Sequence, residues 1–314
     1  MARTRPDVVR RRRGIMSEYL GGLFAAKPAV RQPFELGFAA MGACRWDQAI
    51  GHFQKAVAET KGVRRVALLN LIGVCHYTQG RPDVALKDFE ESARLAEKFG
   101  DKRGKARALG NTGLIYRDNG ELDRALSYLE GALAIAREAR DRWAVAIHLG
   151  YTGNIHHDKG ELDRALEYYG EALAITREIG DQWGVASNLS NIGSIYRDKG
   201  RLDEALECDN GALAVARELG HLLGVATDLG NIGLILKDQS KHEQAVPKLA
   251  EALIALLNMG VADGPRQTLT GLAGCEDKLG RRRLVELLED AGRDDGVIAE
   301  LLERVDQMRQ KRPE

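Results

Sequence analysis

The 314-residue chain carries 46 basic and 46 acidic side chains, and its formal net charge is zero. Hydrophobic residues make up 44% and charged residues 29%, a balance that excludes a wholly disordered chain. Aromatic residues make up only 5%, so the composition favours helices over strands.

Residues 1–30 are expected to form a basic, flexible N-terminal tail. Residues 1–13 hold six arginines, four of them in the run 10–13, against one aspartate. Such a run can contact nucleic acid or an anionic membrane, but no amphipathic or aromatic pattern accompanies it, and a solubilising tail is favoured. Glu18 and Lys27 interrupt the apolar stretch that follows, which argues against a signal peptide. Met16 is an alternative start.

The rest of the chain points to a cytoplasmic protein. Residues 14–314 carry 40 basic and 45 acidic groups, a net charge of −5, so no nucleic-acid partner is expected. No run of 18 apolar residues exists, and no membrane span is expected. The four cysteines lie far apart without a C-x-x-C pair, which favours free thiols in a reducing compartment.

An internal repeat of 40 residues dominates the chain. Residues 110–149 and 150–189 align without a gap at 24 identities in 40 positions, and residues 150–189 and 190–229 at 20. The same register extends over residues 70–109 and 230–269, with a shorter first unit at 34–69 and a degenerate last unit at 270–289. A period of this length indicates stacked supersecondary units.

Each repeat is predicted to form two helices, as in residues 141–180. Asp141 is a good N-cap, and Gly160 ends the first helix because glycine adopts a left-handed conformation readily. The second helix then shows the three-and-four spacing of an amphipathic stripe. Small Gly153 and Ala165 let the two helices of the hairpin approach closely.

One such hairpin cannot bury its own apolar face, so neighbouring hairpins must stack. The sequence therefore predicts an all-α fold, an α-α superhelix (solenoid) of about six to seven hairpins over residues 31–290. The first helix of each hairpin is expected to line its concave face. Residues 291–314 are expected to form a C-terminal capping helix with a charged end.

The repeat resembles the tetratricopeptide signature. Leu109, Thr112, Gly113, Tyr116 and Ala125 fit its spacing, with Leu in place of the signature Trp and without the closing Pro. The 40-residue period is similar to the long-repeat subgroup of Pins-type adaptors, kinesin light chains and the repeat tails of bacterial signalling ATPases. The resemblance implies binding of another protein, as an extended peptide or a helix, although fold alone does not fix function.

Asn111, Asn191 and Asn231 share one slot of the first helix, with Tyr151 in the same slot, and Asn154 lies three residues beyond Tyr151. The resemblance implies that asparagines there hydrogen-bond a ligand backbone, because an amide offers both a donor and an acceptor. The alternative is a polar slot that only faces solvent. The predicted partner-binding residues are Arg107, Asn111, Arg117, Tyr151, Asn154, Asn191, Arg197, Asn231 and Lys237.

No catalytic residue, metal site or cofactor is predicted. The triplet His156-His157-Asp158 has metal-ligand chemistry, but it occupies the slots of Tyr116-Arg117-Asp118, and adjacent helical side chains point about 100° apart. The segment 100–105 is one residue short of a phosphate-binding loop.

A protein-protein interaction adaptor or scaffold, not an enzyme, is the leading hypothesis for the function. Two alternatives are open: a peptide-responsive sensor that controls a signalling ATPase or a transcription regulator, and a scaffold that self-assembles through its end repeats.

Overall fold

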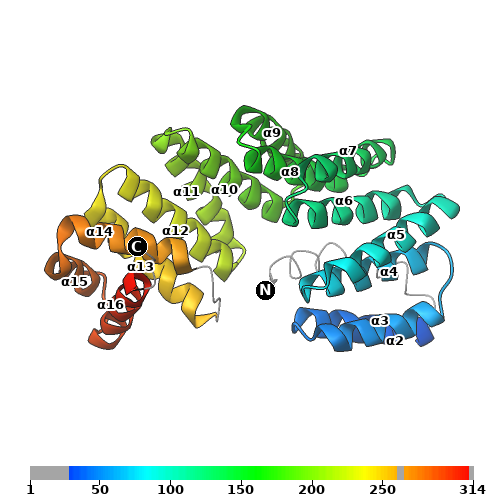
Figure 1. Ribbon diagram of the computed structural model, residues 1–314, viewed down its shortest axis with the longest axis horizontal. Coiled ribbons are helices and arrows are strands. Elements are labelled where there is room, and N and C mark those ends of the chain that lie inside the picture. Colours follow the sequence, from blue (N-terminus) through cyan, green and yellow to red (C-terminus); the bar gives the residue numbers. More distant parts are fainter. Residues whose placement is uncertain (1–27, 260–264, 311–314) are drawn as a thin grey trace. The chain divides into compact units, whose positions relative to one another are not determined.

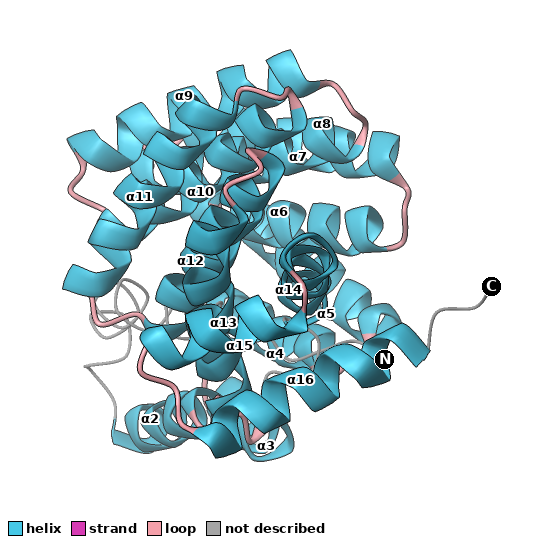
Figure 2. Cartoon of the chain, turned by 90° about the vertical axis from the view of Figure 1, so that its left-hand side faces the viewer, coloured by secondary structure: helices cyan, strands magenta, loops and turns pink. Residues whose placement is uncertain are grey.

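The computed structural model describes residues 28–259 and 265–310, and this part of the chain contains fifteen helices and no strand (Figures 1 and 2). The all-α prediction is confirmed. No described helix is both long and apolar enough to cross a membrane. Residues 1–27 lie outside the described part, and the arginine run and Met16 lie there with them. Residues 28–30, expected to belong to the tail, already belong to the first helix.

The chain divides into two compact units, with the boundary between Ile175 and Thr176. The first unit consists of helical hairpins that follow one another along the chain, coloured blue to green in Figure 1. Its helices are α2 (Pro28–Gly42), α3 (Trp46–Ala58), α4 (Val63–Thr78), α5 (Pro82–Lys98), α6 (Lys102–Asp118), α7 (Leu122–Glu138), α8 (Arg142–Asp158) and α9 (Leu162–Glu178), whose last three residues fall in the second unit.

The second unit continues the same pattern and ends on an unpaired helix, α16. Its helices are α10 (Gln182–Asp198), α11 (Leu202–Glu218), α12 (Leu222–Asp238), α13 (His242–Asn258), α14 (Pro265–Leu279), α15 (Arg281–Asp290) and α16 (Asp295–Gln310). Seven hairpins and a terminal helix therefore make up the described residues, in agreement with the predicted solenoid.

Local sequence explains where the helices begin and end. The Asp141 carboxylate accepts a hydrogen bond from the backbone N–H of Ala144 at 3.1 Å, and it satisfies one of the unpaired amides at the start of α8. Asp101 and Asp181 cap α6 and α10 in the same way. Gly160 ends α8 with φ 74°, a left-handed conformation that costs glycine little.

The two helices of a hairpin pack through a small residue on the first and a large one on the second. A side chain on Gly153 would lie 2.8 Å from the Tyr169 ring, so only glycine allows this approach of α8 and α9. Tyr169 is 1% exposed and Ala165 is fully buried. The close contact expected from the sequence at Gly153 and Ala165 is thus present, and the interior is packed densely enough that no larger residue fits.

Helix α16 closes the second unit. Its buried residues Ile298, Leu301 and Val305 belong to one hydrophobic cluster with Leu284 and Leu288 of α15. This packing covers an apolar surface that the last hairpin would otherwise expose to water.

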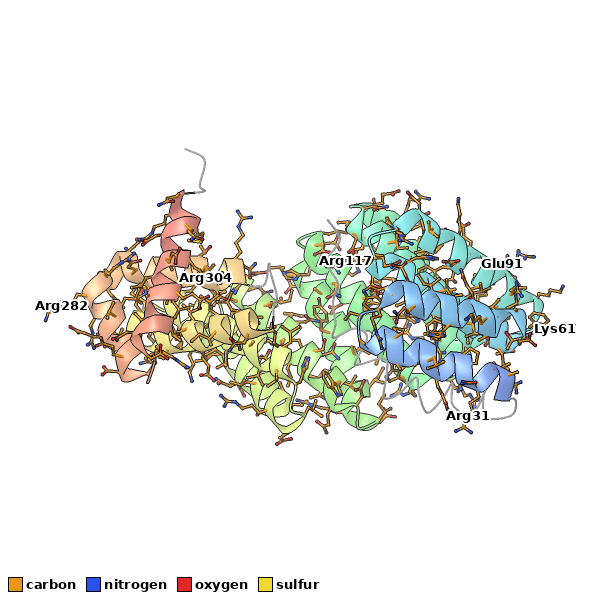
Figure 3. All side chains as sticks on the ribbon, turned by 90° about the horizontal axis from the view of Figure 1, so that it is seen from below. Arg31, Lys61, Glu91, Arg117, Arg282 and Arg304 are labelled. Atoms are coloured by element: carbon orange, nitrogen blue, oxygen red, sulfur yellow. The ribbon has the colours of Figure 1, made fainter. Side chains whose placement is uncertain are left out.

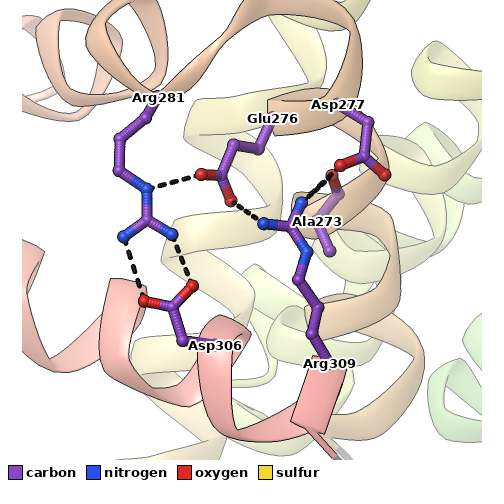
Figure 4. A network of polar contacts seen from close by, with 6 residues as sticks. All are labelled: Ala273, Glu276, Asp277, Arg281, Asp306 and Arg309. Atoms are coloured by element: carbon purple, nitrogen blue, oxygen red, sulfur yellow. Dashed lines mark hydrogen bonds and ion pairs between the residues drawn. The ribbon is translucent and has the colours of Figure 1, made fainter. Parts of the chain in front are cut away.

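Ion pairs reinforce this closure (Figure 4). The carboxylate of Glu276, itself 6% exposed, accepts a hydrogen bond from Arg281 at 2.5 Å and pairs with Arg309 at 3.1 Å. Arg281 also binds Asp306 of α16 through both terminal nitrogens, at 2.5 and 3.1 Å. Residues of α14, α15 and α16 are therefore tied together around one buried carboxylate.

Candidate partner-binding site on the first helices

A small pocket lies on the first helices of three successive hairpins, α4, α6 and α8, all within the first unit. It has a volume of about 50 Å³, room for a few water molecules or for one small chemical group. Its lining consists of Asn70, Leu71, Val74, Arg107, Gly110, Asn111, Trp143, Ala144, Ile147, His148 and Tyr151. Three of the nine predicted binding residues, Arg107, Asn111 and Tyr151, are among them.

Gly110 of α6 makes room for His148, and both residues line the pocket. A β-carbon on Gly110 would collide with the imidazole of His148, which is 3% exposed and packs across the gap from α8. Leu71, Val74 and Ile147 supply apolar walls. The result is a pocket that is largely apolar and carries a few polar groups, as is typical of recognition sites.

Oδ1 of Asn70 and Nε1 of Trp143 belong to residues of the pocket lining. Both atoms are buried and have no hydrogen-bond partner among the described residues. The Asn70 side chain is held in place through its other end, where Nδ2 donates to the hydroxyl of Ser92 at 2.7 Å. Buried polar groups are nearly always paired in native proteins, so these two atoms are exceptions to the usual pattern.

Arg117, by contrast, belongs to a contact between repeats. Its guanidinium donates to the carboxylate of Asp158, on the next first helix, at 2.5 Å, and Figure 3 labels it among the side chains of the first unit. Tyr77 and Asp118 make the equivalent contact one repeat earlier. The charge of Arg117 is thus balanced by a carboxylate 41 residues away in the chain.

Asn154 is also engaged inside the protein. Its Oδ1 accepts a hydrogen bond from the hydroxyl of Tyr169 at 2.6 Å, within the α8–α9 hairpin. Burial raises the pKa of Tyr169, so its hydroxyl stays protonated and remains a donor. The Asn154 amide is thus held by Tyr169, and its part in binding a partner stays a prediction.

The other predicted residues lie in the second unit, on α10 and α12, and all are partly buried. Asn191 and Arg197 stand on α10, Asn231 and Lys237 on α12. Lys237 pairs with its neighbour Asp238 at 2.9 Å, and Nδ2 of Asn231 donates to the Asp209 carboxylate at 3.4 Å. Their part in binding a partner stays a prediction.

A pair of buried acids in the second unit escaped the sequence analysis. Asp209 and Asp228 are 1% and 2% exposed. Burial, and then the charge of Asp228, raises the pKa of Asp209 to about 7, although the hydrogen bond from Asn231 acts in the opposite direction. Burial raises the pKa of Asp228 to about 6, against the hydrogen bond that Ser190 donates at 2.5 Å. One signal was available: Asp209 stands four residues after Ala205, where the neighbouring repeats carry Tyr169 and Leu249.

The triplet at 156–158 does not converge on one point. His156 pairs with Glu161 at 2.8 Å and stacks on Tyr168 with ring centroids 5.0 Å apart, while Asp158 binds Arg117. Residues 28–259 and 265–310 contain no group of three histidine, cysteine or carboxylate side chains that could hold a metal ion.

A second hollow of about 520 Å³ lies on the second helices α7 and α9, lined by charges of both signs.

The sequence model of the tetratricopeptide repeat matches residues 64–138, 105–178 and 184–256. No curated protein matches the chain. Many solved structures share its fold, and three of them illustrate the range. A kinesin light chain from Podosopora anserina with nearly identical TPR-like repeats has a TM-score of 0.52 at 13% identity, and the match covers 64% of this chain and 99% of that one.

The Rap conjugation gene regulator of the plasmid pLS20, in complex with the Phr* peptide, has a TM-score of 0.62 at 17% identity, covering 89% of this chain and 73% of that one. A signal transduction ATPase with numerous domains, from Pyrococcus horikoshii, has a tetratricopeptide repeat sensor. Its TM-score is 0.65 at 14% identity, and the match covers 88% of this chain and 43% of that one. At these identities the structures show the shared fold alone. The matches of the family model, over more than half of the chain, show that this protein belongs to the tetratricopeptide repeat family.

Proposed function

We propose that this protein is a cytoplasmic adaptor that binds another protein on the surface of its first helices, without catalysing a reaction. The observation that carries the proposal is the pocket on α4, α6 and α8, whose lining brings together the predicted binding residues Arg107, Asn111 and Tyr151. A largely apolar pocket with a few polar side chains can fix both the position and the orientation of a ligand group.

An extended peptide or one helix of a partner is the ligand that this surface suits. The pocket is too small for a cofactor-sized ligand, which needs about 300–1,000 Å³, but it can hold one group of a longer chain. The similar Rap regulator is in complex with a peptide, which supports a ligand of this kind.

A peptide-responsive sensor is the second candidate. It is favoured by the likeness to the ATPase from Pyrococcus horikoshii, whose repeats are described as its sensor. In that case a peptide would change the conformation of the repeats, which small-angle scattering with and without the peptide would detect as a change in compactness.

Site-specific photo-crosslinking tests the adaptor. A benzoylphenylalanine is placed at Leu114 or Ile147 on the first helices, and at the exposed positions Ser127 or Glu167 on the second helices as matched controls. We expect a partner to crosslink from Leu114 and Ile147 only. Equal crosslinking from Ser127 and Glu167 would place the interaction elsewhere and contradict the proposal.

A further inference from the structure

We propose that Asp209 and Asp228 form a proton-dependent contact, which holds α10, α11 and α12 together while both carboxyls are neutral and loosens these helices when they ionise. The two side chains lie on neighbouring helices of the second unit, Asp209 on α11 and Asp228 on α12, and are 1% and 2% exposed. Such a contact goes beyond the proposed function, because it gives the repeats a response to pH that needs no partner.

Both acids depart from the repeat, and both fall in the unit 190–229. In the other units the slot of Asp209 holds apolar or aromatic residues, which are Phe89, Leu129, Tyr169 and Leu249. The slot of Asp228 holds residues that are not acidic, which are Leu68, Ala108, His148, Asn188 and Thr268. Two acids at buried slots gain nothing in packing, and departures of this kind from the pattern of a fold are typical of functional positions.

The two carboxyls connect three helices. Oδ1 of Asp228 accepts a hydrogen bond from the Ser190 hydroxyl on α10 at 2.5 Å, and Oδ1 of Asp209 accepts one from Nδ2 of Asn231 on α12 at 3.4 Å. The Asp209 carboxyl also packs against Gly193 of α10, where an added β-carbon would lie 3.0 Å from it. A charge on these two side chains therefore acts on the packing of α10, α11 and α12 at once.

Both carboxyls favour the neutral form in the packed helices. Their hydrogen bonds come from a hydroxyl and from an amide, and neither donor brings a positive charge that would offset the loss of water around a carboxylate. Oδ2 of Asp209 is buried and has no hydrogen-bond partner among the described residues. In agreement with this geometry, burial and then the charge of Asp228 raise the pKa of Asp209 to about 7, and burial raises the pKa of Asp228 to about 6.

The charges around the two carboxyls oppose this effect of burial without cancelling it. Arg197 on α10 lowers the pKa of Asp209, and His221 at the start of α12 lowers the pKa of Asp228. On α11 itself the titratable neighbour is the thiol of Cys208, whose pKa is raised by burial and then by the charge of Asp209. Helices α13 and α14 also pack against α12, and in the described part of the chain neither supplies a charge that acts on either carboxyl.

Proton binding is therefore coupled to the packing of the three helices. When the helices separate, water reaches the carboxyls, and their pKa returns to the ordinary value of about 3.9. Between about pH 4 and pH 7 the closed helices bind more protons than the open ones, so opening becomes more frequent as pH rises and levels off above about pH 7. The opening is local, because each repeat contacts only its neighbours.

Hydrogen exchange of the full chain, read by mass spectrometry at pH 5 and pH 8, tests this contact. After correction for the intrinsic exchange rate, we expect peptides from α10, α11 and α12 to lose protection by about tenfold or more between pH 5 and pH 8. Peptides from α6 and α7 in the first unit are the internal control, and their protection should change less than about threefold. An equal loss in both units, or no loss in either, would overturn the proposal.

Three variants assign the response to the two acids. The double variant Asp209→Asn, Asp228→Asn keeps the size of both side chains and should show the same protection at pH 5 and at pH 8. His221→Asn is the matched control, because asparagine is a good N-cap that does not titrate, and it should retain the loss of protection. A response that survives the double variant, or that disappears in His221→Asn, would refute the role of the acids.

Ser190→Ala removes only the hydroxyl that favours the ionised form of Asp228. The pKa of Asp228 should rise further, and the loss of protection between pH 5 and pH 8 should become about twofold larger or more. An unchanged loss in Ser190→Ala would contradict the part of Asp228. This variant and the pH series on the unchanged protein decide the matter even where the double variant fails to fold.

Discussion

Asp209 faces Gly193 across the α10–α11 hairpin, in the relation that Tyr169 has to Gly153 one repeat earlier. A β-carbon on Gly193 would lie 3.0 Å from the Asp209 carboxyl, so the carboxyl fills the place of the aromatic ring in the core. The hairpins α6–α7 and α12–α13 place Leu129 and Leu249 there. A buried acid beside a second acid, Asp228, is an unfavourable choice for packing alone.

The buried acids should make stability fall as pH rises. The ordinary pKa of aspartate is about 3.9, and in the folded protein it is raised to about 7 for Asp209 and to about 6 for Asp228. Between about pH 4 and pH 7 the folded state therefore binds more protons than the unfolded state. The free energy of unfolding should drop by roughly 2–4 kcal/mol over this window, as urea titrations at pH 5 and pH 8 would measure.

Asp209→Leu should remove most of this pH dependence and raise stability at pH 8, because the next repeat carries Leu249 in the same slot. Leu129→Asp is the reciprocal control and should introduce a similar dependence into the first unit. Equal unfolding free energies of the unchanged protein at pH 5 and pH 8 would show that the two acids are not protonated in the folded state.

Arg140 stands where the neighbouring repeats carry glycine. Its φ is 53°, in the left-handed region, and Gly100, Gly180 and Gly220 occupy the same slot. A residue other than glycine adopts that conformation at a cost of about 1 kcal/mol. Arg140→Gly should therefore stabilise the protein by about 0.5–1 kcal/mol, because the greater freedom of glycine in the unfolded chain offsets part of the gain. Thermal unfolding measures the change, with Gly180→Ala as the control that should lower the midpoint. A lower midpoint for Arg140→Gly would contradict this account.

Helix α16 should keep the second unit monomeric. Removal of residues 291–314 would expose Leu284 and Leu288, which are fully buried. We expect the truncated protein to associate, as multi-angle light scattering would show, and to unfold more readily. Removal of residues 311–314 alone is the matched control and should change neither property. A monomeric protein of unchanged stability after the larger deletion would show that α16 is not a cap.

The repeat made the fold predictable. Because the same slots recur every 40 residues, the helices predicted for one hairpin could be transferred to the others. The close contact at Gly153 was predictable because a small residue recurs at that position. Helical periodicity alone also predicts that Asn111 and Tyr151 face away from Gly113 and Tyr116. Their part in binding a partner stays a prediction.

The features that the sequence did not predict arise where a repeat departs from the shared pattern or where two repeats contact each other. Asn70, Trp143 and His148 occupy three different slots, so no shared pattern links them, and only the folded chain brings them to one pocket. The partner of Arg117 is 41 residues away and not its neighbour, because the offset between stacked hairpins sets that contact.

The affinity for the crosslinked partner tests the central claim most directly. Isothermal calorimetry would compare the unchanged protein with the double variant Asn111→Ala, Tyr151→Ala and with Arg117→Ala, which removes the contact to Asp158 near the same surface. We expect the double variant to bind about 10–100-fold more weakly, equivalent to about 1–3 kcal/mol, with little change in thermal stability. Arg117→Ala should lower stability and keep the affinity. Unchanged affinity in the double variant would contradict a binding site on the first helices.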